Sequence, residues 1–221
     1  VRAPVEALCK NMMRKRVFAL LAILLGAFSA ECYAVGFGIR AGASGRYSDF
    51  GSANVQGSTL STSPRIGFNV GIYTDIKLFG FGSSESSASG LYIRPEGVFT
   101  MTGLDVSSSG GQSCRVRMQS VDIPVLISVK VKFFRIYAGP TLTAMDKNKT
   151  LGADGMDLST IRPFVNYAAG VGFDMGMFTV DMRYDGVFKR PTGSVRIGEM
   201  TTGENVRFGA GGLAVSIGVA F

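Results

Sequence analysis

The sequence contains no histidine and no tryptophan among its 221 residues, and only three cysteines. Without histidine, Ser-His and Asp-His catalytic arrangements are excluded, as are zinc sites built from three histidines or from histidine with cysteine. Charged residues make up 18% of the chain, whereas glycine supplies 30 residues. This balance argues against a disordered chain. We therefore predict a folded protein that is not an enzyme and has no cofactor and no metal site.

Long apolar runs are also missing. The longest one, residues 17–28, has about a dozen residues, whereas a membrane-spanning helix needs about 20. Arg14, Lys15 and Arg16 precede this run, and Ala34 ends the short segment that follows it. This pattern predicts a signal peptide over residues 12–34 that is cleaved after Ala34. A retained anchor helix and a lipid anchor at Cys32 are the weaker alternatives.

These boundaries divide the chain into residues 1–11, interpreted as an over-long gene start, the signal peptide 12–34, and a domain over residues 35–221. Removing residues 1–34 lowers the net charge from +7 to +4. The remaining positive charges are scattered, so no nucleic-acid partner is expected. Only Cys114 remains in the domain, which excludes an internal disulfide.

Residues 213–221 alternate large apolar side chains with small ones, and they end on Phe221. Such alternation indicates a strand with one apolar face, because successive side chains of a strand point to opposite faces. An aromatic residue at this position is typical of strands that end at a membrane interface. The same alternation predicts seven further strands, over residues 35–47, 65–79, 91–103 and 116–132, from residue 134, over residues 162–175, and from residue 178.

Charged residues in these strands fall on the face opposite the apolar one: Asp75, Lys77, Arg94, Glu96, Asp122, Lys130, Asp181 and Arg183. A Lys or Arg that faces lipid at mid-bilayer costs about 2–4 kcal/mol, whereas charges of opposite sign inside a barrel can pair. The sequence therefore predicts an all-β fold, an eight-stranded antiparallel up-and-down transmembrane β-barrel. A soluble lipocalin-like barrel that binds an apolar ligand is the alternative, with the two faces exchanged.

Two prolines lie inside predicted strands. Proline lacks the N–H donor of the strand ladder and is normally confined to edges and bulges. We therefore predict β-bulges at Pro95 and Pro124, and the alternative is that both strands break there.

Five segments of the predicted strands form a recognisable set: YIRPE (92–96), VDIPVL (121–126), AGVG (169–172), VDMRY (180–184) and the strand that ends at Phe221. With these motifs, roughly residues 35–221 resemble the PorT-like outer-membrane β-barrel family, which belongs to the small barrels of the porin and OmpA-like type. It implies an eight-stranded barrel in the outer membrane of a Gram-negative bacterium. For function it implies a role associated with secretion or envelope assembly.

We predict a non-enzymatic outer-membrane protein that is structural or that binds a partner through its loops or periplasmic turns. A narrow channel for small solutes is the second hypothesis. An enzyme that pairs Glu96 with Asp122 or Asp181 is a third, and ion pairing in the lumen is the preferred interpretation of those carboxylates. The expected partners are outer-membrane lipid, the barrel assembly machinery, for which Phe221 is the candidate assembly residue, and an unidentified envelope protein. The predicted polar cluster of the lumen consists of Arg40, Arg94, Glu96, Asp181 and Arg183.

Overall fold

A computed structural model describes most of the predicted domain. The described residues are 35–49, 54–55, 58–81, 89–108, 113–151, 156–161, 165–188, 192–197, 200–201, 206–207 and 209–221. The chain divides into two units, Val1–Ala34 and Val35–Phe221. The predicted gene start, signal peptide and cleavage site lie in the first unit, outside the described residues.

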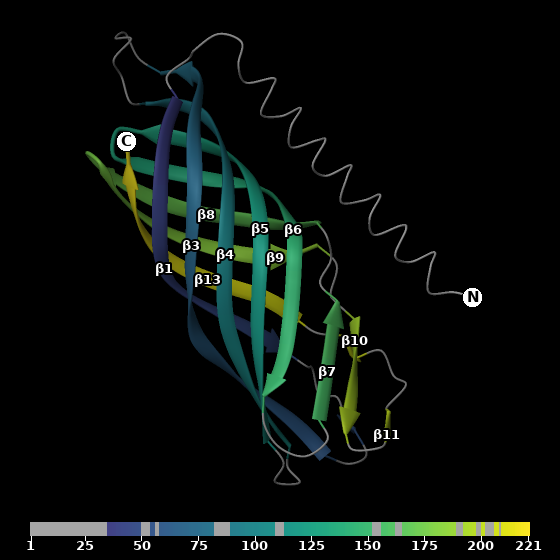
Figure 1. Cartoon of the computed structure of the whole chain (residues 1–221). Helices are drawn as coiled ribbons and strands as arrows, with labels where there is room; N and C mark the ends of the chain where they lie inside the picture. Colours follow the sequence, from purple (N-terminus) through teal and green to yellow (C-terminus); the bar gives the residue numbers. More distant parts are fainter. Residues whose placement is uncertain are drawn as a thin grey trace, which may run out of the picture. The chain divides into compact units, whose positions relative to one another are not determined.

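Eight antiparallel strands form a closed ring, as the sequence predicts. Neighbouring strands pair in chain order, and β13 pairs with β1, which also pairs with β3, so the ring has no free edge. Figure 1 shows β1 and β3 to β6 crossing in front of β8, β9 and β13. The strands are β1 (Val35–Asp49), β3 (Ser58–Gly80), β4 (Gly90–Ser108), β5 (Ser113–Val131), β6 (Phe134–Leu151), β8 (Val165–Met175), β9 (Phe178–Val187) and β13 (Gly209–Ala220).

The strands are longer than predicted on one side of the ring. β3 begins at Ser58 and not at residue 65, and β6, predicted to start at residue 134, continues to Leu151. These extensions are polar, so their hydrophobic pattern does not mark them as strands. What makes them strands is pairing with neighbouring strands, as between β5 and the last residues of β6.

Short strands also occur in three of the segments that connect the eight wall strands. The strand β10 (Thr192–Ile197) pairs with β7 (Met156–Ile161), β11 (Met200–Thr201) and β12 (Val206–Arg207), and β2 (Asn54–Val55) pairs with β3. Because β7 and β10 are far apart in the chain, no local pattern shows that they pair.

The predicted β-bulges at the two prolines are wrong. Pro95 pairs with Val125 inside β4, Pro124 pairs with Thr141 inside β5, and the β4–β5 and β5–β6 registers do not shift at either proline. Neither strand breaks there. A proline removes one ladder hydrogen bond. The β4–β5 register is the same before and after Pro95, whereas the β5–β6 register shifts between Val121 and Asp122, two residues before Pro124.

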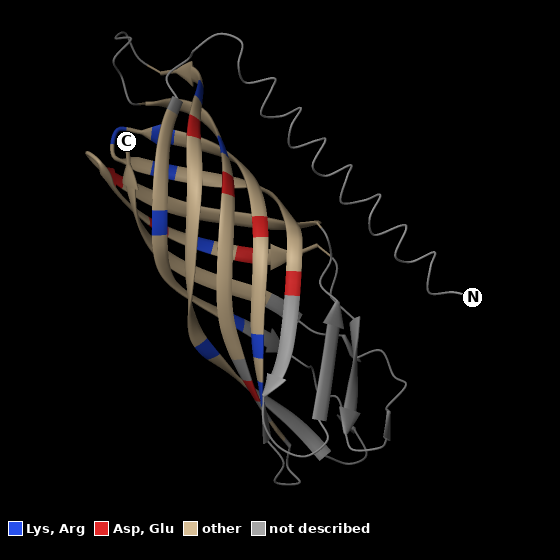
Figure 2. Cartoon of the chain, in the orientation of Figure 1, with Lys and Arg blue, Asp and Glu red and all other residues tan. Residues whose placement is uncertain are grey.

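Side chains alternate between a polar interior and an apolar exterior. In β13, Val215 is 52% exposed and points outward, whereas Ser216 is 3% exposed and points inward. In Figure 2 the charged residues of the barrel form short, isolated bands along strands that are otherwise uncharged. This arrangement is the reverse of a lipocalin-like barrel, whose interior is apolar. Within the described residues, no helix is long and apolar enough to cross a membrane.

Inward-facing glycines make room for large neighbours. Gly38 in β1 pairs with Tyr73 in β3, and a Cβ atom at Gly38 would overlap the buried Tyr73 ring. We expect Gly38→Ala to lower the free energy of unfolding by about 1–3 kcal/mol, because it overpacks this contact. Urea titration of the detergent-solubilised protein measures the change.

The matched control is Gly45→Ala on the same strand, where nothing lies within 4 Å of the added Cβ. We expect a change within about 0.5 kcal/mol for this variant. An equal loss of stability in both variants would contradict the close approach at Gly38.

Candidate functional site

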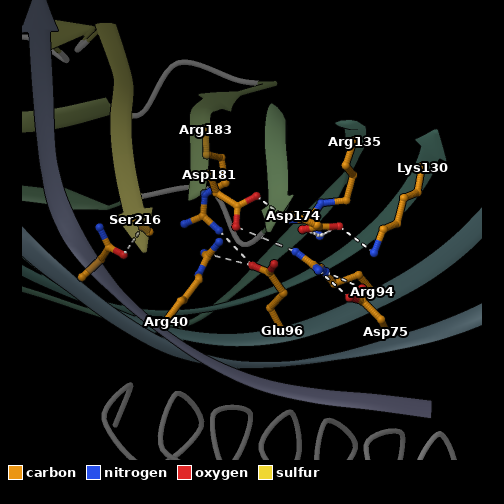
Figure 3. A network of polar contacts seen from close by, with 11 residues as sticks. Arg40, Asp75, Arg94, Glu96, Lys130, Arg135, Asp174, Asp181, Arg183 and Ser216 are labelled. Atoms are coloured by element: carbon orange, nitrogen blue, oxygen red, sulfur yellow. Dashed lines mark hydrogen bonds and ion pairs between the residues drawn. The ribbon is translucent and has the colours of Figure 1, made fainter. Parts of the chain in front are cut away.

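The barrel interior contains a network of buried ion pairs contributed by seven of the eight wall strands (Figure 3). Strand alternation places every second side chain inside, where the charged groups meet across the ring. The cations are Arg40, Arg94, Lys130, Arg135 and Arg183, and the anions are Asp75, Glu96, Asp174, Asp181 and Asp185. We call these ten residues the lumen network.

Glu96 is the anion shared by two arginines. Its Oε2 lies 2.9 Å from Nη2 of Arg40 and accepts a 3.0 Å hydrogen bond from Nη1 of Arg183. Nε of Arg183 also lies 3.1 Å from Oδ1 of Asp185. These contacts join β1, β4 and β9, which are not neighbours of one another except through the lumen. Glu96 therefore links opposite parts of the wall.

Asp181, like Glu96, is an anion shared by two arginines. Its Oδ1 accepts a 2.6 Å hydrogen bond from Nη2 of Arg135, and its Oδ2 lies 4.0 Å from Nη1 of Arg94. Arg94 also donates two 2.5 Å hydrogen bonds to the two carboxylate oxygens of Asp75. Arg94 therefore bridges two carboxylates from opposite sides of the lumen.

The network continues to the short-turn end of the barrel, where β5 meets β6 and β8 meets β9. Asp174 accepts a 3.0 Å hydrogen bond from Nη1 of Arg135, and Nζ of Lys130 lies 2.7 Å from its Oδ2. The guanidinium carbon of Arg94 lies 4.2 Å from the centre of the Tyr73 ring, a cation–π contact. Five positive and five negative side chains thus compensate one another, and the lumen network carries no net charge.

A second polar group lies nearer the long-loop end, where β1 and β6 end. Asp122 accepts hydrogen bonds of 2.8 Å from Ser120 and from Thr143, and Arg46 lies 3.5 Å from its Oδ2. Asn166 donates a 2.9 Å hydrogen bond to Thr143. Among the described side chains, this part of the lumen is lined by hydroxyl and amide groups and contains the ion pair between Arg46 and Asp122.

The structure brings the five predicted lumen residues together. Arg40 and Arg183 contact Glu96, Arg94 contacts Asp181, and each of the five side chains is at most 4% exposed. The prediction of the cluster omitted five other members: Asp75, Lys130, Arg135, Asp174 and Asp185. Alternation places all five on the polar face, but it does not show which strands meet across the closed ring.

Phe221, the predicted assembly residue, is 75% exposed, and its backbone N–H donates a 2.7 Å hydrogen bond to the carbonyl of Phe37. The role of Phe221 in assembly stays a prediction. The carboxylates considered for catalysis are engaged, since Glu96 and Asp181 are held by arginines and Asp122 by two hydroxyl groups. Such contacts favour the structural interpretation of all three.

No protein-family profile matches the chain, and no curated protein matches it. Among solved structures, the chain is similar to the outer membrane protein OprG from Pseudomonas aeruginosa, with 11% sequence identity and a TM-score of 0.48. The match covers 85% of this chain and 96% of the OprG chain. At this level of similarity the fold assignment rests on the strand pairing itself, and the resemblance to the PorT-like family stays a prediction from sequence.

We expect Glu96→Gln to destabilise the barrel by about 3–5 kcal/mol, because it leaves Arg40 and Arg183 buried without their shared anion. Asp105→Asn is the control, since its partners Arg65 and Arg115 are exposed and such pairs contribute at most about 1 kcal/mol. Urea midpoints of both variants in detergent measure the difference. Equal midpoints would show that the buried network contributes no more than a surface pair.

Proposed function

We propose that the protein is a non-enzymatic outer-membrane β-barrel with a closed lumen, and that it acts through the surfaces at the two ends of the barrel. The observation that carries this proposal is a closed ring with an apolar exterior and a lumen crossed by ion pairs. In lipid every backbone polar group needs a partner within the protein, and a closed barrel supplies one for each strand.

The apolar exterior has the height expected of a membrane-spanning band. Along β5 the outward positions from Val121 to Val131 are all aliphatic, and they alternate with inward Asp122, Ser128 and Lys130. This stretch is about 11 residues long, which matches the 9–11 residues of a tilted transmembrane strand. Beyond it, the outward positions are Gln119, Arg117 and Arg115.

Aromatic residues border this band at both ends. At the short-turn end, four strands carry an exposed or half-buried phenylalanine, and a fifth phenylalanine directly follows β13. These residues are Phe37, Phe134, Phe173, Phe178 and Phe221. At the long-loop end, the Tyr167 ring lies 6.1 Å from Tyr184 and 5.1 Å from Phe188. Aromatic girdles at both interfaces are typical of outer-membrane barrels, and they support placing this barrel in an outer membrane.

The filled lumen favours a structural or partner-binding role over conduction. An eight-stranded barrel is about wide enough for its own side chains to fill, and the lumen network joins strands on opposite sides through direct contacts. The narrow channel stays the second candidate because hydroxyl and amide groups line the long-loop half of the lumen. A role beside secretion or envelope-assembly machinery is a finer proposal that rests on the sequence resemblance alone.

The placement in a membrane predicts that substitutions on the outer face depend on depth. We expect Val125→Arg, near the middle of the apolar band, to cost about 2–4 kcal/mol, and Val131→Arg, near its end, about 0–1 kcal/mol. Detergent gels of boiled and unboiled membrane fractions, combined with urea titration, measure the folded barrel. A protein that shows no heat-dependent shift and stays in the soluble fraction would contradict the proposal.

The closed lumen predicts that the protein reconstituted in planar bilayers shows no stable single-channel steps. The variant to compare with the unmodified protein is Arg94→Ala. It removes the side chain that lies between Asp75 and Asp181 and so leaves a gap in the lumen network. We expect conductance steps only in this variant. Regular steps in the unmodified protein would favour the narrow channel instead.

A further inference from the structure

Four strands of the barrel continue beyond the apolar band at the long-loop end. These are β3, β4, β5 and β6, whose residues 58–65, 102–108, 113–120 and 146–151 extend past the point where β8 starts at Val165 and β9 ends at Val187. The extensions pair with one another without interruption from β3 to β6. We call this four-stranded extension the rim sheet.

The outer face of the rim sheet is basic. Arg65, Arg115 and Arg117 are all exposed, and the side chains of Arg65 and Arg115 are 45% and 57% accessible to solvent. In the pairing register Arg65 lies across from Gly103, Gly103 from Arg117, and Arg117 from Lys149. Lys147 lies across from Gln119, next to this row. Cationic residues thus occupy this row on β3, β5 and β6, and Gly103 of β4 lies between Arg65 and Arg117.

A single described carboxylate lies between these arginines. Oδ1 of Asp105 accepts a 3.1 Å hydrogen bond from Nε of Arg115, and its Oδ2 lies 3.7 Å from Nη1 of Arg65. Asp105 compensates one of the three positive charges of the described side chains. It also orients two guanidinium groups around one point, which leaves the outer face with an excess of positive charge.

A β-bulge is what turns Arg65 outward. The β3–β4 register shifts between Arg65 and Phe68, so that Ile66 and Gly67 are accommodated without a one-to-one partner. Simple alternation would place Arg65 inside, opposite to Ile66, and the bulge changes its face. Arg65 consequently joins the basic row in place of the lumen.

The basic row begins directly where the apolar band ends. On β5 the change falls between Val121 and Gln119, and on β3 Arg65 lies three residues from Phe68, whose ring packs 6.2 Å from Phe99. At about 3.3 Å per residue, Arg65 and Arg117 lie roughly 10–13 Å along their strands from the last apolar residues, and Arg115 lies roughly 20 Å away. Because the strands of such a barrel are tilted, Arg65 and Arg117 lie close to the level of lipid headgroups, just outside the hydrocarbon layer, and Arg115 lies farther out.

We infer that the outer face of the rim sheet binds the phosphate groups of the lipids around the barrel. Guanidinium groups bind phosphate oxygens through paired hydrogen bonds, and basic residues at a membrane surface attract anionic headgroups. The continuity with the apolar band favours a lipid over a soluble phosphate compound, because the acyl chains of a bound lipid would lie against Phe68 and Val121. This inference rests on the membrane placement proposed above.

The test uses the full domain folded in detergent and three probes: lipid A with both phosphates, lipid A with its phosphates removed, and inorganic phosphate. Each probe is titrated, and the temperature at which the unboiled folded band disappears is recorded. Phosphorylated lipid A should raise this temperature. The double variant Arg115→Gln/Arg117→Gln should bind it about 25-fold more weakly, since each basic residue at a surface contributes about fivefold.

Two variants serve as controls. Lys132→Gln removes an exposed positive charge at the short-turn end and should change the apparent affinity less than twofold. Arg115→Lys/Arg117→Lys keeps the charges and should bind more tightly than the Gln double variant. The unboiled band itself shows whether each variant is folded.

Unchanged binding by the Gln double variant, or an equal effect of dephosphorylated lipid A, would overturn the inference. An equal effect of inorganic phosphate would overturn the choice of lipid as its source. A protein with no heat-dependent shift would contradict the membrane placement itself. A heat-modifiable barrel that does not respond to phosphorylated lipid A would contradict only the headgroup site.

Discussion

Charged side chains on the strands of this barrel, along its apolar band, are stable only when they point into the lumen and pair there, and much of the structure follows from that constraint. A Lys or Arg that faced lipid would cost several kcal/mol, so the charged residues of the strands point inward. Inside, a charge without a partner is costly as well, and the ten residues of the lumen network compensate one another. Glu96 and Asp181 each hold two arginines from different strands, and so they join parts of the wall that do not otherwise touch.

The filled interior leaves little for the lumen to do as a passage. Tyr73 is accommodated because Gly38 faces it, and its ring packs against Arg94. Packed side chains and ion pairs thus fill the same part of the lumen. The activity we propose therefore lies on the ends of the barrel, where strands and loops leave the membrane.

The two ends differ in a way that bears on partners. The short-turn end is bordered by phenylalanines, whereas the long-loop end carries the rim sheet on one side of the ring. Arg65, Arg115 and Arg117 lie on its outer face, which we propose contacts lipid headgroups, and Asp105 orients two of them. A barrel whose strands extend unequally presents a polar wall on one side only, so the proposed contacts with headgroups would act on that side of the barrel.

The alternation of polar and apolar residues is a local property of a strand, because successive side chains point to opposite faces. Alternation in the sequence therefore determined the all-β fold class, the approximate positions of the eight barrel strands, and the face on which charges such as Arg94 and Asp181 lie. It did not determine which charges meet, since Arg183 of β9 and Glu96 of β4 contact each other only across the lumen of the closed ring. The prediction of bulges also failed at Pro95 and Pro124, where the register does not shift, although a shift lies two residues before Pro124. Alternation failed at Arg65, where a bulge places the side chain on the outer face. Pairing partners, register and cross-lumen contacts join residues that are distant in the chain, and only the closed ring decides them.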